Sequence, residues 1–185
     1  GKDCREFKYY HNTIIQPVGQ VTIINSLAAL KKLVFDEKKV PMAELLEALK
    51  NNWEGREDLR QQFINDGPKW GNDDDYVDLI GREFYRKTNQ AVKSFKNIWG
   101  WPFNEDGTGA SSYYDYSGMT GATPDGRKDL DLFNDGTVSP VIGTDKKGPL
   151  ATMKSISKLD HAGTFTHLFN QKFTPQELTK NNGAN

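Results

Sequence analysis

Apolar residues recur at helical spacing through the first half of the chain. The first set follows Asn25 and Ser26, residue types that cap helix N-termini, and consists of Leu27, Leu30, Leu33 and Val34. Because steps of three and four residues place side chains on one face of a helix, this spacing predicts a helix over residues 27–36. Residues 13–24 are rich in β-branched side chains and are interrupted by Pro17 and Gly19, so we expect extended chain there.

The same reasoning predicts three more helices before residue 97. Pro41 suits the first turn of a helix whose apolar face consists of Met42, Leu45, Leu46 and Leu49. A short helix is expected over residues 56–64, and a longer one follows, with Asn72 or Asp73 as its N-cap. The inner face of this longer helix is expected to consist of Val77, Ile80, Phe84, Ala91 and Phe95.

The second half of the chain is divided by turns. Residues 121–149, called the turn block below, contain glycine, proline or aspartate every few positions. Its tight-turn sequences are Pro124-Asp125-Gly126, Asn134-Asp135-Gly136, Ser139-Pro140 and Lys147-Gly148-Pro149. A loop of this length within a folded domain is unusual unless it has a function.

Alternating side chains after the turn block predict strands over residues 150–159 and 165–173. The predicted fold class is therefore α/β, with helices in the first half of the chain and strands in the second. Its three parts are a mainly helical segment at residues 25–97, aromatic and turn-rich loops at 98–149, and strands at 150–175.

Composition narrows the classes of function. Lys and Arg number 24 and Asp and Glu number 25, so no basic excess indicates a nucleic-acid partner. No apolar stretch approaches the roughly twenty residues of a membrane-spanning helix. The single cysteine, Cys4, excludes an internal disulfide and favours a reducing, cytoplasmic compartment.

No residue pattern indicates a metal site. The acidic run Asp73-Asp74-Asp75, with Asp78, lacks the spacing of a calcium loop, and helix capping explains it better. The three histidines are expected to be isolated from one another and from Cys4, with no zinc spacing among them: His11, His161 and His167. We expect each histidine to be an ordinary surface or hydrogen-bonded residue.

The string GATPDGRKDLDLFNDGTVSPVIGTDKKGPLATMKSISKLDH resembles a signature block near the C-terminal end of the catalytic domain of the glycyl radical enzymes. The usual form of that block is close to ATPDGRK, followed by DG, SP, G-x-D, GPTA and S-x-x-K. Four more stretches match in the order that the family requires: NSLAALKKLVFDEKKV, NNWEGREDLR, PKWGNDDDYVD and LFNQKFTP. The resemblance therefore covers essentially the whole chain.

The resemblance implies a portion of a ten-stranded α/β barrel made of two antiparallel five-stranded half-sheets. In such enzymes a radical on a backbone glycine passes to a cysteine, whose thiyl abstracts hydrogen from the substrate. No cofactor is expected to bind directly, because a separate iron–sulfur, S-adenosylmethionine-dependent activating enzyme installs the radical. The family motifs fall on residues for which we expect structural roles: Asn72, Asp73, Pro124, Asp125, Gly126 and Arg127.

The reactive residues of the family have no clear counterpart in this sequence. No string resembles RVxGY, the surroundings of the radical glycine, and we expect the chain to end before that domain. Cys4 lies outside a GC-x-E-like loop and close to the first predicted helix, which fits a nonradical cysteine. We therefore expect residues 1–185 to be a single internal fragment of a longer catalytic subunit, inactive alone.

Trp70, together with DKKGP and LFNQKF, most resembles the fumarate-adding benzylsuccinate and alkylsuccinate synthases. These carbon–carbon lyases add a hydrocarbon radical to fumarate in anaerobic hydrocarbon degradation. Leu150, where the family usually has threonine, departs from the pattern. Arylacetate decarboxylases and diol-type dehydratases share the other motifs and remain alternatives, as does a non-catalytic structural or interaction module.

The strand expected after the turn block supplies the candidates for a substrate pocket, because barrel strands point alternate side chains inward. The candidates are Trp70, Ala151, Thr152, Met153 and Ser155. Trp70 and Met153 would form apolar walls for a hydrocarbon, or else simply fill the core. Arg127, Lys128 and Lys154 are candidates for attracting a dicarboxylate, although Arg127 in such a loop more often binds backbone carbonyls.

The expected partners follow from the resemblance. They are the remainder of the catalytic subunit, the activating enzyme, small accessory subunits, a second catalytic subunit and a small-molecule substrate. Neither a nucleic acid nor a membrane span is expected.

Overall fold

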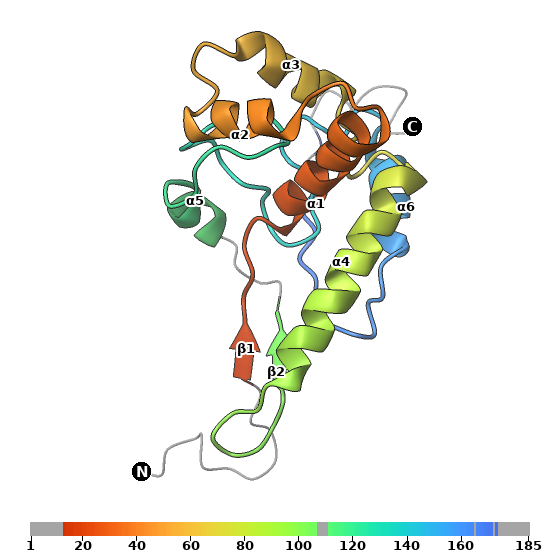
Figure 1. Ribbon diagram of the computed structural model, residues 1–185. Coiled ribbons are helices and arrows are strands. Elements are labelled where there is room, and N and C mark those ends of the chain that lie inside the picture. The colour runs from red at the N-terminus through yellow and green to blue at the C-terminus, as the bar shows by residue number, and fades with distance from the viewer. Residues whose placement is uncertain (1–12, 107–110, 165, 172, 174–185) are drawn as a thin grey trace.

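A computed structural model describes residues 13–106, 111–164, 166–171 and 173 of the chain. The elements, in chain order, are β1 (Thr13–Ile15), α1 (Gln20–Ala29), the π-helix η2 (Leu30–Asp36), α2 (Met42–Lys50), α3 (Glu57–Asp66), α4 (Asp75–Ser94), β2 (Phe103–Glu105), α5 (Ser112–Ser117) and α6 (Pro149–Ser157). Figure 1 shows α2 and α3 at one end of the molecule and the two strands at the other, with α4 running between these ends.

The first helix begins earlier than predicted, at Gln20. Its N-terminus is capped from the turn block, because Asn134 Oδ1 accepts hydrogen bonds from the backbone N–H groups of Val21 and Thr22 at 3.2 and 3.4 Å. Asn25 and Ser26, the predicted caps, lie inside the helix and are buried. The β-branched residues near its start are helical because α1 packs against α4.

Helices α2, α3 and α4 agree with the predicted positions to within a few residues. The N-cap of α4 is Asp74, whose side chain accepts from Tyr76 N at 3.0 Å, rather than Asn72 or Asp73. Its buried face consists of Val77, Asp78, Gly81, Tyr85 and Asn89. Ala91 and Phe95 were predicted to be buried but are exposed, since the helix leaves the core before its last turn.

Two clusters of apolar side chains form the core. The first joins α1 and α4 to the turn block and contains Val21, Ile24, Ala28, Trp70, Val77, Tyr85, Val138 and Leu159. The second lies under η2, α2 and α3 and contains Ala29, Leu33, Val40, Leu45, Ala48, Trp53, Leu59 and Phe63. Because α1 and η2 are continuous, their shared helix carries residues of both clusters.

The two strands are parallel, and the helices from α1 to α4 connect them. Thr13, Ile14 and Ile15 pair in register with Phe103, Asn104 and Glu105. A parallel pair requires a long crossover connection, typically helical, which is the arrangement of α/β folds. The structure therefore agrees with the predicted class in this region.

The strand predicted over residues 150–159 is wrong, because residues 149–157 form α6. The helix starts at Pro149, a favoured first position, after Gly148 at φ 81°. Its buried residues, Ala151, Thr152 and Ser155, have helical spacing and face the chain before α4. The expected strand range 150–175 is thus incorrect in its first part.

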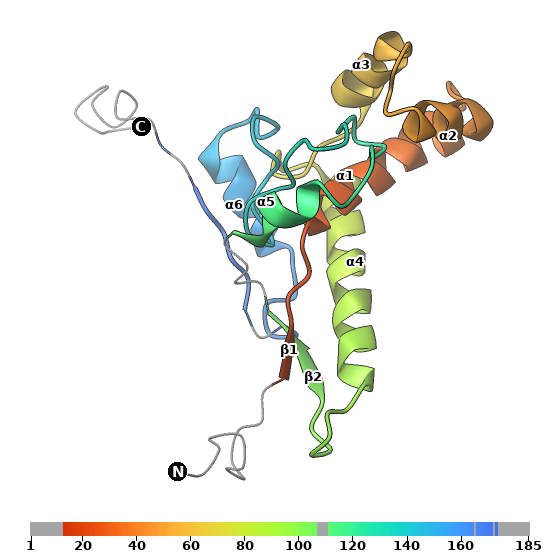
Figure 2. The same cartoon turned by 90° about the vertical axis from the view of Figure 1, so that its left-hand side faces the viewer.

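The described residues of the segment 165–173 do not form a named strand either. Leu168 nevertheless lies against the turn block, since its carbonyl accepts from the backbone N–H groups of Thr137 and Val138, both at 3.2 Å. Figure 2 shows this segment passing beside α6 toward the strand pair. The loops expected over residues 98–149 also contain β2 and α5.

Among the residues described, the structure has no helix with the length and apolar character needed to cross a membrane.

Candidate functional site

Arg127 organises the turn block from inside. Its guanidinium donates to four backbone carbonyls, those of Thr120, Gly121, Asp131 and Ser117, at 2.6, 2.5, 2.7 and 3.4 Å. It also lies over the ring of Phe133, 4.4 Å from the centroid. The side chain is buried, and burial lowers its pKa. These contacts agree with carbonyl binding rather than with attraction of a dicarboxylate.

Asp125 and Gly126 lock the turn that precedes this arginine. Asp125 is buried and accepts from Thr123 Oγ1 at 2.6 Å, and burial raises the pKa of its carboxyl group. Gly126 has φ 98°, and a Cβ there would meet Ile64 Cγ1 at 2.4 Å, so only glycine fits. Arg60 Nε donates to the Gly126 carbonyl at 2.7 Å. The turn is therefore fixed against α3.

The side chain of Trp70 is fully buried. Its side chain is 0% exposed, and Nε1 donates to the Val138 carbonyl at 2.9 Å. Its backbone N–H donates to Asn25 Oδ1 at 2.8 Å, and Gly81 leaves room for the ring. Of the two interpretations of Trp70, the structure agrees with core filling, and the side chain joins α1, α4 and the turn block.

The other predicted pocket residues lie on α6. Thr152 Oγ1 donates to the Gly71 carbonyl at 3.0 Å, and Ala151 is buried. Ser155 Oγ accepts from Asp73 N at 2.9 Å and donates to Asp78 Oδ2 at 3.1 Å. Met153 is 46% exposed on the opposite side. These residues attach α6 to the start of α4.

An ionic cluster completes this attachment. Lys158 Nζ contacts Asp73, Asp75 and Asp78 at 2.7–2.8 Å. Burial alone would lower the pKa of Lys158, but its three carboxylate hydrogen bonds outweigh burial and raise it. Burial raises the pKa of Asp78, whereas the hydrogen bond from Lys158 lowers that of Asp73. Because a lysine occupies the centre, this acidic cluster is a structural joint.

Asn72 joins the loop that precedes α4 to the turn block. Its Nδ2 donates to the carbonyls of Lys69 and Thr144 at 3.0 and 2.8 Å, and its Oδ1 accepts from Lys147 N at 3.1 Å. Asp73 next to it has φ 51°, a left-handed conformation. Asn72 and Asp73 thus both shape the loop.

His161 and His167 are in direct contact, contrary to the expectation that the histidines are isolated. Their Nδ1 atoms lie 2.9 Å apart, and His161 Nε2 lies 2.9 Å from the Ile156 carbonyl. Since a carbonyl only accepts, His161 carries its proton on Nε2, and its Nδ1 accepts from His167. Burial first, and His161 second, lower the pKa of His167 to about 4.

Cys4 and His11 lie outside the described residues. Among the residues that the structure describes, no group of three or more potential ligands is arranged to hold a metal ion.

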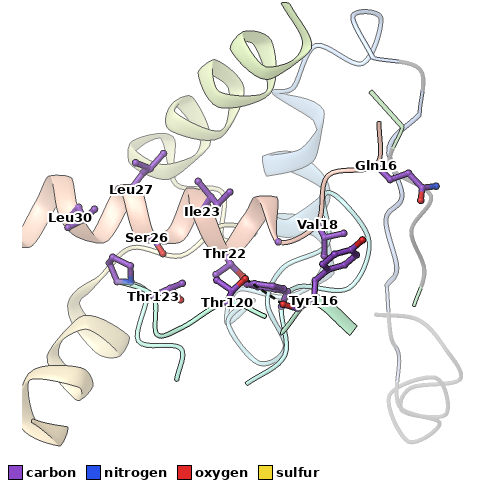
Figure 3. Close-up of a pocket in the computed structure, with 13 residues that line it drawn as sticks. Gln16, Val18, Thr22, Ile23, Ser26, Leu27, Leu30, Tyr116, Thr120 and Thr123 are labelled. Atoms are coloured by element: carbon purple, nitrogen blue, oxygen red, sulfur yellow. Dashed lines mark hydrogen bonds between the residues drawn. The ribbon is translucent and has the colours of Figure 1, made fainter. Parts of the chain in front are cut away.

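A hollow of about 600 Å³ opens beside α1. Its lining comes from the chain after β1, from α1, from α5 and from the turn block: Gln16, Val18, Gly19, Thr22, Ile23, Ser26, Leu27, Leu30, Tyr116, Thr120, Thr123, Pro124 and Phe133. Figure 3 shows Thr22 and Ser26 on the side of α1 that faces Thr120 and Thr123, and Ile23 and Leu27 on the other side.

The pattern of residues along the chain does not reveal this hollow. Only Pro124 of its lining was singled out, and Ser26 was assigned to a helix cap. The available signal was a pair of hydroxyl side chains, Thr22 and Ser26, four residues apart in an otherwise apolar run. This spacing places both on one helix face only once residues 20–29 are known to be helical.

Comparison with known families decides the classification. The family described as "Pyruvate formate lyase-like" matches residues 1–117, well over half of the chain. The chain belongs to the pyruvate formate lyase-like family. A second family description, "Glycine radical", matches residues 134–185, so these two matches identify part of a glycyl radical enzyme. The expectation that the chain ends before the glycine radical domain is therefore wrong.

Relatives within this family are dehydratases and other lyases. The chain is 38% identical to trans-4-hydroxy-L-proline dehydratase of Clostridioides difficile, over 99% of this chain and 23% of that protein. It is 38% identical to isethionate sulfite-lyase of Bilophila wadsworthia, over 86% of this chain and 19% of that protein. The chain thus spans a quarter or less of the length of these relatives.

Solved structures of the family confirm the fold class, a portion of its α/β barrel. The glycerol-bound B12-independent glycerol dehydratase from Clostridium butyricum superimposes with a TM-score of 0.88 and 40% identity, over 95% of this chain and 22% of that one. None of these three relatives is a fumarate-adding synthase. Because Trp70 is a core residue, its identity reflects packing and does not indicate a hydrocarbon substrate.

Proposed function

We propose that the whole protein is a glycyl radical lyase that eliminates a small group from a hydroxylated substrate, as a dehydratase does. The observation that carries this proposal is the likeness to the glycerol dehydratase, at 40% identity and a TM-score of 0.88 over nearly the full chain. The likeness to hydroxyproline dehydratase, at 38% identity, supports it. Elimination is thus favoured over the addition of a hydrocarbon to fumarate.

Decarboxylation of an arylacetate is the second candidate. The chain is 30% identical to indoleacetate decarboxylase and 28% identical to the glycyl radical subunit of 4-hydroxyphenylacetate decarboxylase. These identities are lower than those to the dehydratases, which favours elimination.

The role of residues 13–173 in this function is to hold the frame of the site. Arg127, Asp125 and Gly126 fix the turn block against α3 and α5, and Lys158 fixes α6 against α4. Fixed loops keep reacting groups in place and exclude water from radical intermediates. The proposed partners are the remainder of the subunit and a radical S-adenosylmethionine activating enzyme, with accessory subunits or a second catalytic subunit as further candidates.

The test is to activate the whole protein without oxygen, using its activating enzyme, and to measure the glycyl radical by electron paramagnetic resonance. Propane-1,2-diol, glycerol, trans-4-hydroxy-L-proline, isethionate and indoleacetate are then offered separately, as is a hydrocarbon with fumarate. We expect a radical signal and loss of water or sulfite from one hydroxylated compound. Release of carbon dioxide from indoleacetate, or consumption of fumarate, would contradict elimination.

A further inference from the structure

A second hollow, of about 470 Å³, lies where η2, the end of α3, the loop before α4 and the turn at residues 143–147 meet. Its charged lining residues are four lysines and two aspartates: Lys32, Lys69, Lys146, Lys147, Asp66 and Asp74. The hollow beside α1, by contrast, is lined by no charged residue. Positive charge is therefore in excess at this second hollow.

None of these four ammonium groups forms an ion pair with a carboxylate of the residues that the structure describes. Lys32 Nζ donates to the Asp66 carbonyl at 2.9 Å, and Lys69 Nζ donates to the carbonyls of Phe63 and Asp125 at 2.9 and 3.2 Å. An ammonium group has three donors, so Lys32 keeps two and Lys69 keeps one for another partner. Burial lowers the pKa of Lys69, because its charged form loses hydration, and an anion in the hollow would stabilise that form.

The two aspartates do not neutralise the lysines. Asp74 Oδ1 accepts from Tyr76 N at 3.0 Å as the N-cap of α4, and Asp66 is an exposed residue at the end of α3. Lys146 and Lys147 are exposed as well. The cationic side of the hollow is thus open to an anion from solution.

The backbone that carries Lys146 and Lys147 is fixed. Lys147 N donates to Asn72 Oδ1 at 3.1 Å, and Lys146 N donates to the Thr144 carbonyl at 3.1 Å. Asn72 Nδ2 also donates to the Thr144 carbonyl, at 2.8 Å. Because the turn is held against the loop before α4, binding an anion would restrict only the lysine side chains, which limits its entropic cost.

The lining indicates the chemistry of the ligand. Lysine binds phosphate as a compact point charge, and several lysines around one hollow favour an anion with more than one negative charge. Pro68 and Ile64 add apolar wall, which suits an organic part attached to the anion. The volume of about 470 Å³ lies within the range of small-molecule sites.

We propose that this hollow binds a small organic phosphate with two or more negative charges, which Lys32, Lys146 and Lys147 contact. The proposal goes beyond the proposed lyase function and does not depend on it.

The experiment measures binding of inorganic pyrophosphate to the whole, unactivated protein by isothermal titration calorimetry. Lys146→Ala and Lys147→Ala are each expected to weaken binding about five-fold, and higher salt is expected to weaken it for the wild type. Lys50→Ala is the matched control, because Lys50 is an exposed lysine of α2 outside the hollow and should leave binding unchanged. Absence of pyrophosphate binding, or equal effects of the three variants, would overturn the proposal.

A variant with the opposite effect sharpens the test. Asp66→Asn removes a negative charge from the lining and is expected to tighten pyrophosphate binding about two-fold. Asp58→Asn, on the same helix but outside the hollow, should not change it, since its side chain is 82% exposed. Succinate, which carries less charge, is expected to bind at least about three-fold more weakly than pyrophosphate, and tighter binding of succinate would contradict a phosphate site.

Thermal unfolding without added anion separates a ligand site from a structural contact. Since Lys146 Nζ has no carboxylate partner among the described residues, Lys146→Ala is expected to leave the unfolding midpoint unchanged. A lowered midpoint without pyrophosphate binding would show that carboxylates from elsewhere in the subunit occupy the hollow, and it would overturn the proposal. Loss of elimination activity in the activated wild type, with pyrophosphate binding intact, would contradict only the lyase function.

Discussion

The helices between residues 20 and 94 and the turn block are ordered by different forces. In the helical region, apolar side chains repeat at helical spacing and bury themselves, as Phe63 and Trp53 do with ring centroids 5.7 Å apart. In the turn block, a buried arginine and a buried asparagine organise the backbone, with Val138 and Phe133 as the buried apolar side chains. Apolar burial is non-directional, whereas a hydrogen bond requires a defined partner at a defined distance.

The two regions also depend on each other. The turn block supplies Asn134, which caps α1, and α3 supplies Arg60, which binds the Gly126 carbonyl. Trp53 Nε1 in the helical region donates to the Arg127 carbonyl at 3.2 Å. Substitutions on the two sides therefore measure how far each force stabilises the whole.

The largest effect is expected from Phe63→Ala in the second core cluster. This side chain is 0% exposed, and its loss leaves a cavity, so we expect a loss of about 3–5 kcal/mol in the free energy of unfolding. Urea unfolding of the whole protein, followed by tryptophan fluorescence, measures it. Phe95→Ala is the control, because Phe95 is 64% exposed and should contribute little. Equal effects of the two would contradict the assignment of the core.

Arg127→Ala is expected to lower the free energy of unfolding by somewhat less, about 2–4 kcal/mol, because it leaves several buried carbonyls without a donor. The same unfolding measurement applies, with Lys128→Ala as the neighbouring control on an accessible side chain that pairs with Glu57. Arg127→Lys is also expected to be destabilising, since an ammonium group cannot reproduce the planar fork. If both Arg127 variants match the wild type, the turn block is not held by this side chain.

Asn134→Ala removes the cap of α1 and is expected to lower the free energy of unfolding by about 1–2 kcal/mol. Asn134→Asp retains the accepting oxygen and places a negative charge at a helix N-terminus, so a smaller loss is expected. Hydrogen exchange of the first turn of α1 localises the effect, which a general loss of stability would not reproduce. Equal exchange in the Ala variant and the wild type would contradict capping across the two regions.

The last comparison concerns pH. The pKa of His167 is about 4 in the folded protein, below its ordinary value of about 6.5. The unfolded chain therefore binds more protons between these values, so this stabilisation is complete above about pH 6.5 and is lost as the pH falls toward 4. As the pH is lowered across this range, the thermal unfolding midpoint should fall less steeply for His167→Gln than for the wild type. An unchanged slope would remove His167 as a source of the pH dependence.

The helices that the sequence predicts well are those whose partners are close in sequence. α2, α3 and α4 have clear caps or start signals and an apolar face, so local spacing sufficed. The strand predicted at Ala151–Ser155 failed because serine, threonine and alanine alternate there without a strong local preference. Their helical conformation depends on contacts with Gly71, Asp73 and Asp78, about eighty positions earlier.

The candidate site shows the same contrast between local sequence patterns and contacts of distant residues. Trp70 and Met153 were chosen by residue type; Trp70 is fully buried, Met153 is 46% exposed, and a role of either in a substrate pocket stays a prediction. The hollow beside α1 combines the chain after β1 and a face of α1 with α5 and the loop at residues 120–133, which come much later in the chain. Spacing within one segment cannot reveal such a combination.

The sequence by itself determined the family, the helical first half and the turn-rich character of residues 121–149, because motifs, apolar periodicity and turn residues are local properties. Only the tertiary structure decided where α1 begins, that residues 149–157 are helical and that Trp70 is a core residue. These outcomes depend on hydrogen bonds and packing between residues far apart in the chain, and their geometry exists only after the chain has folded.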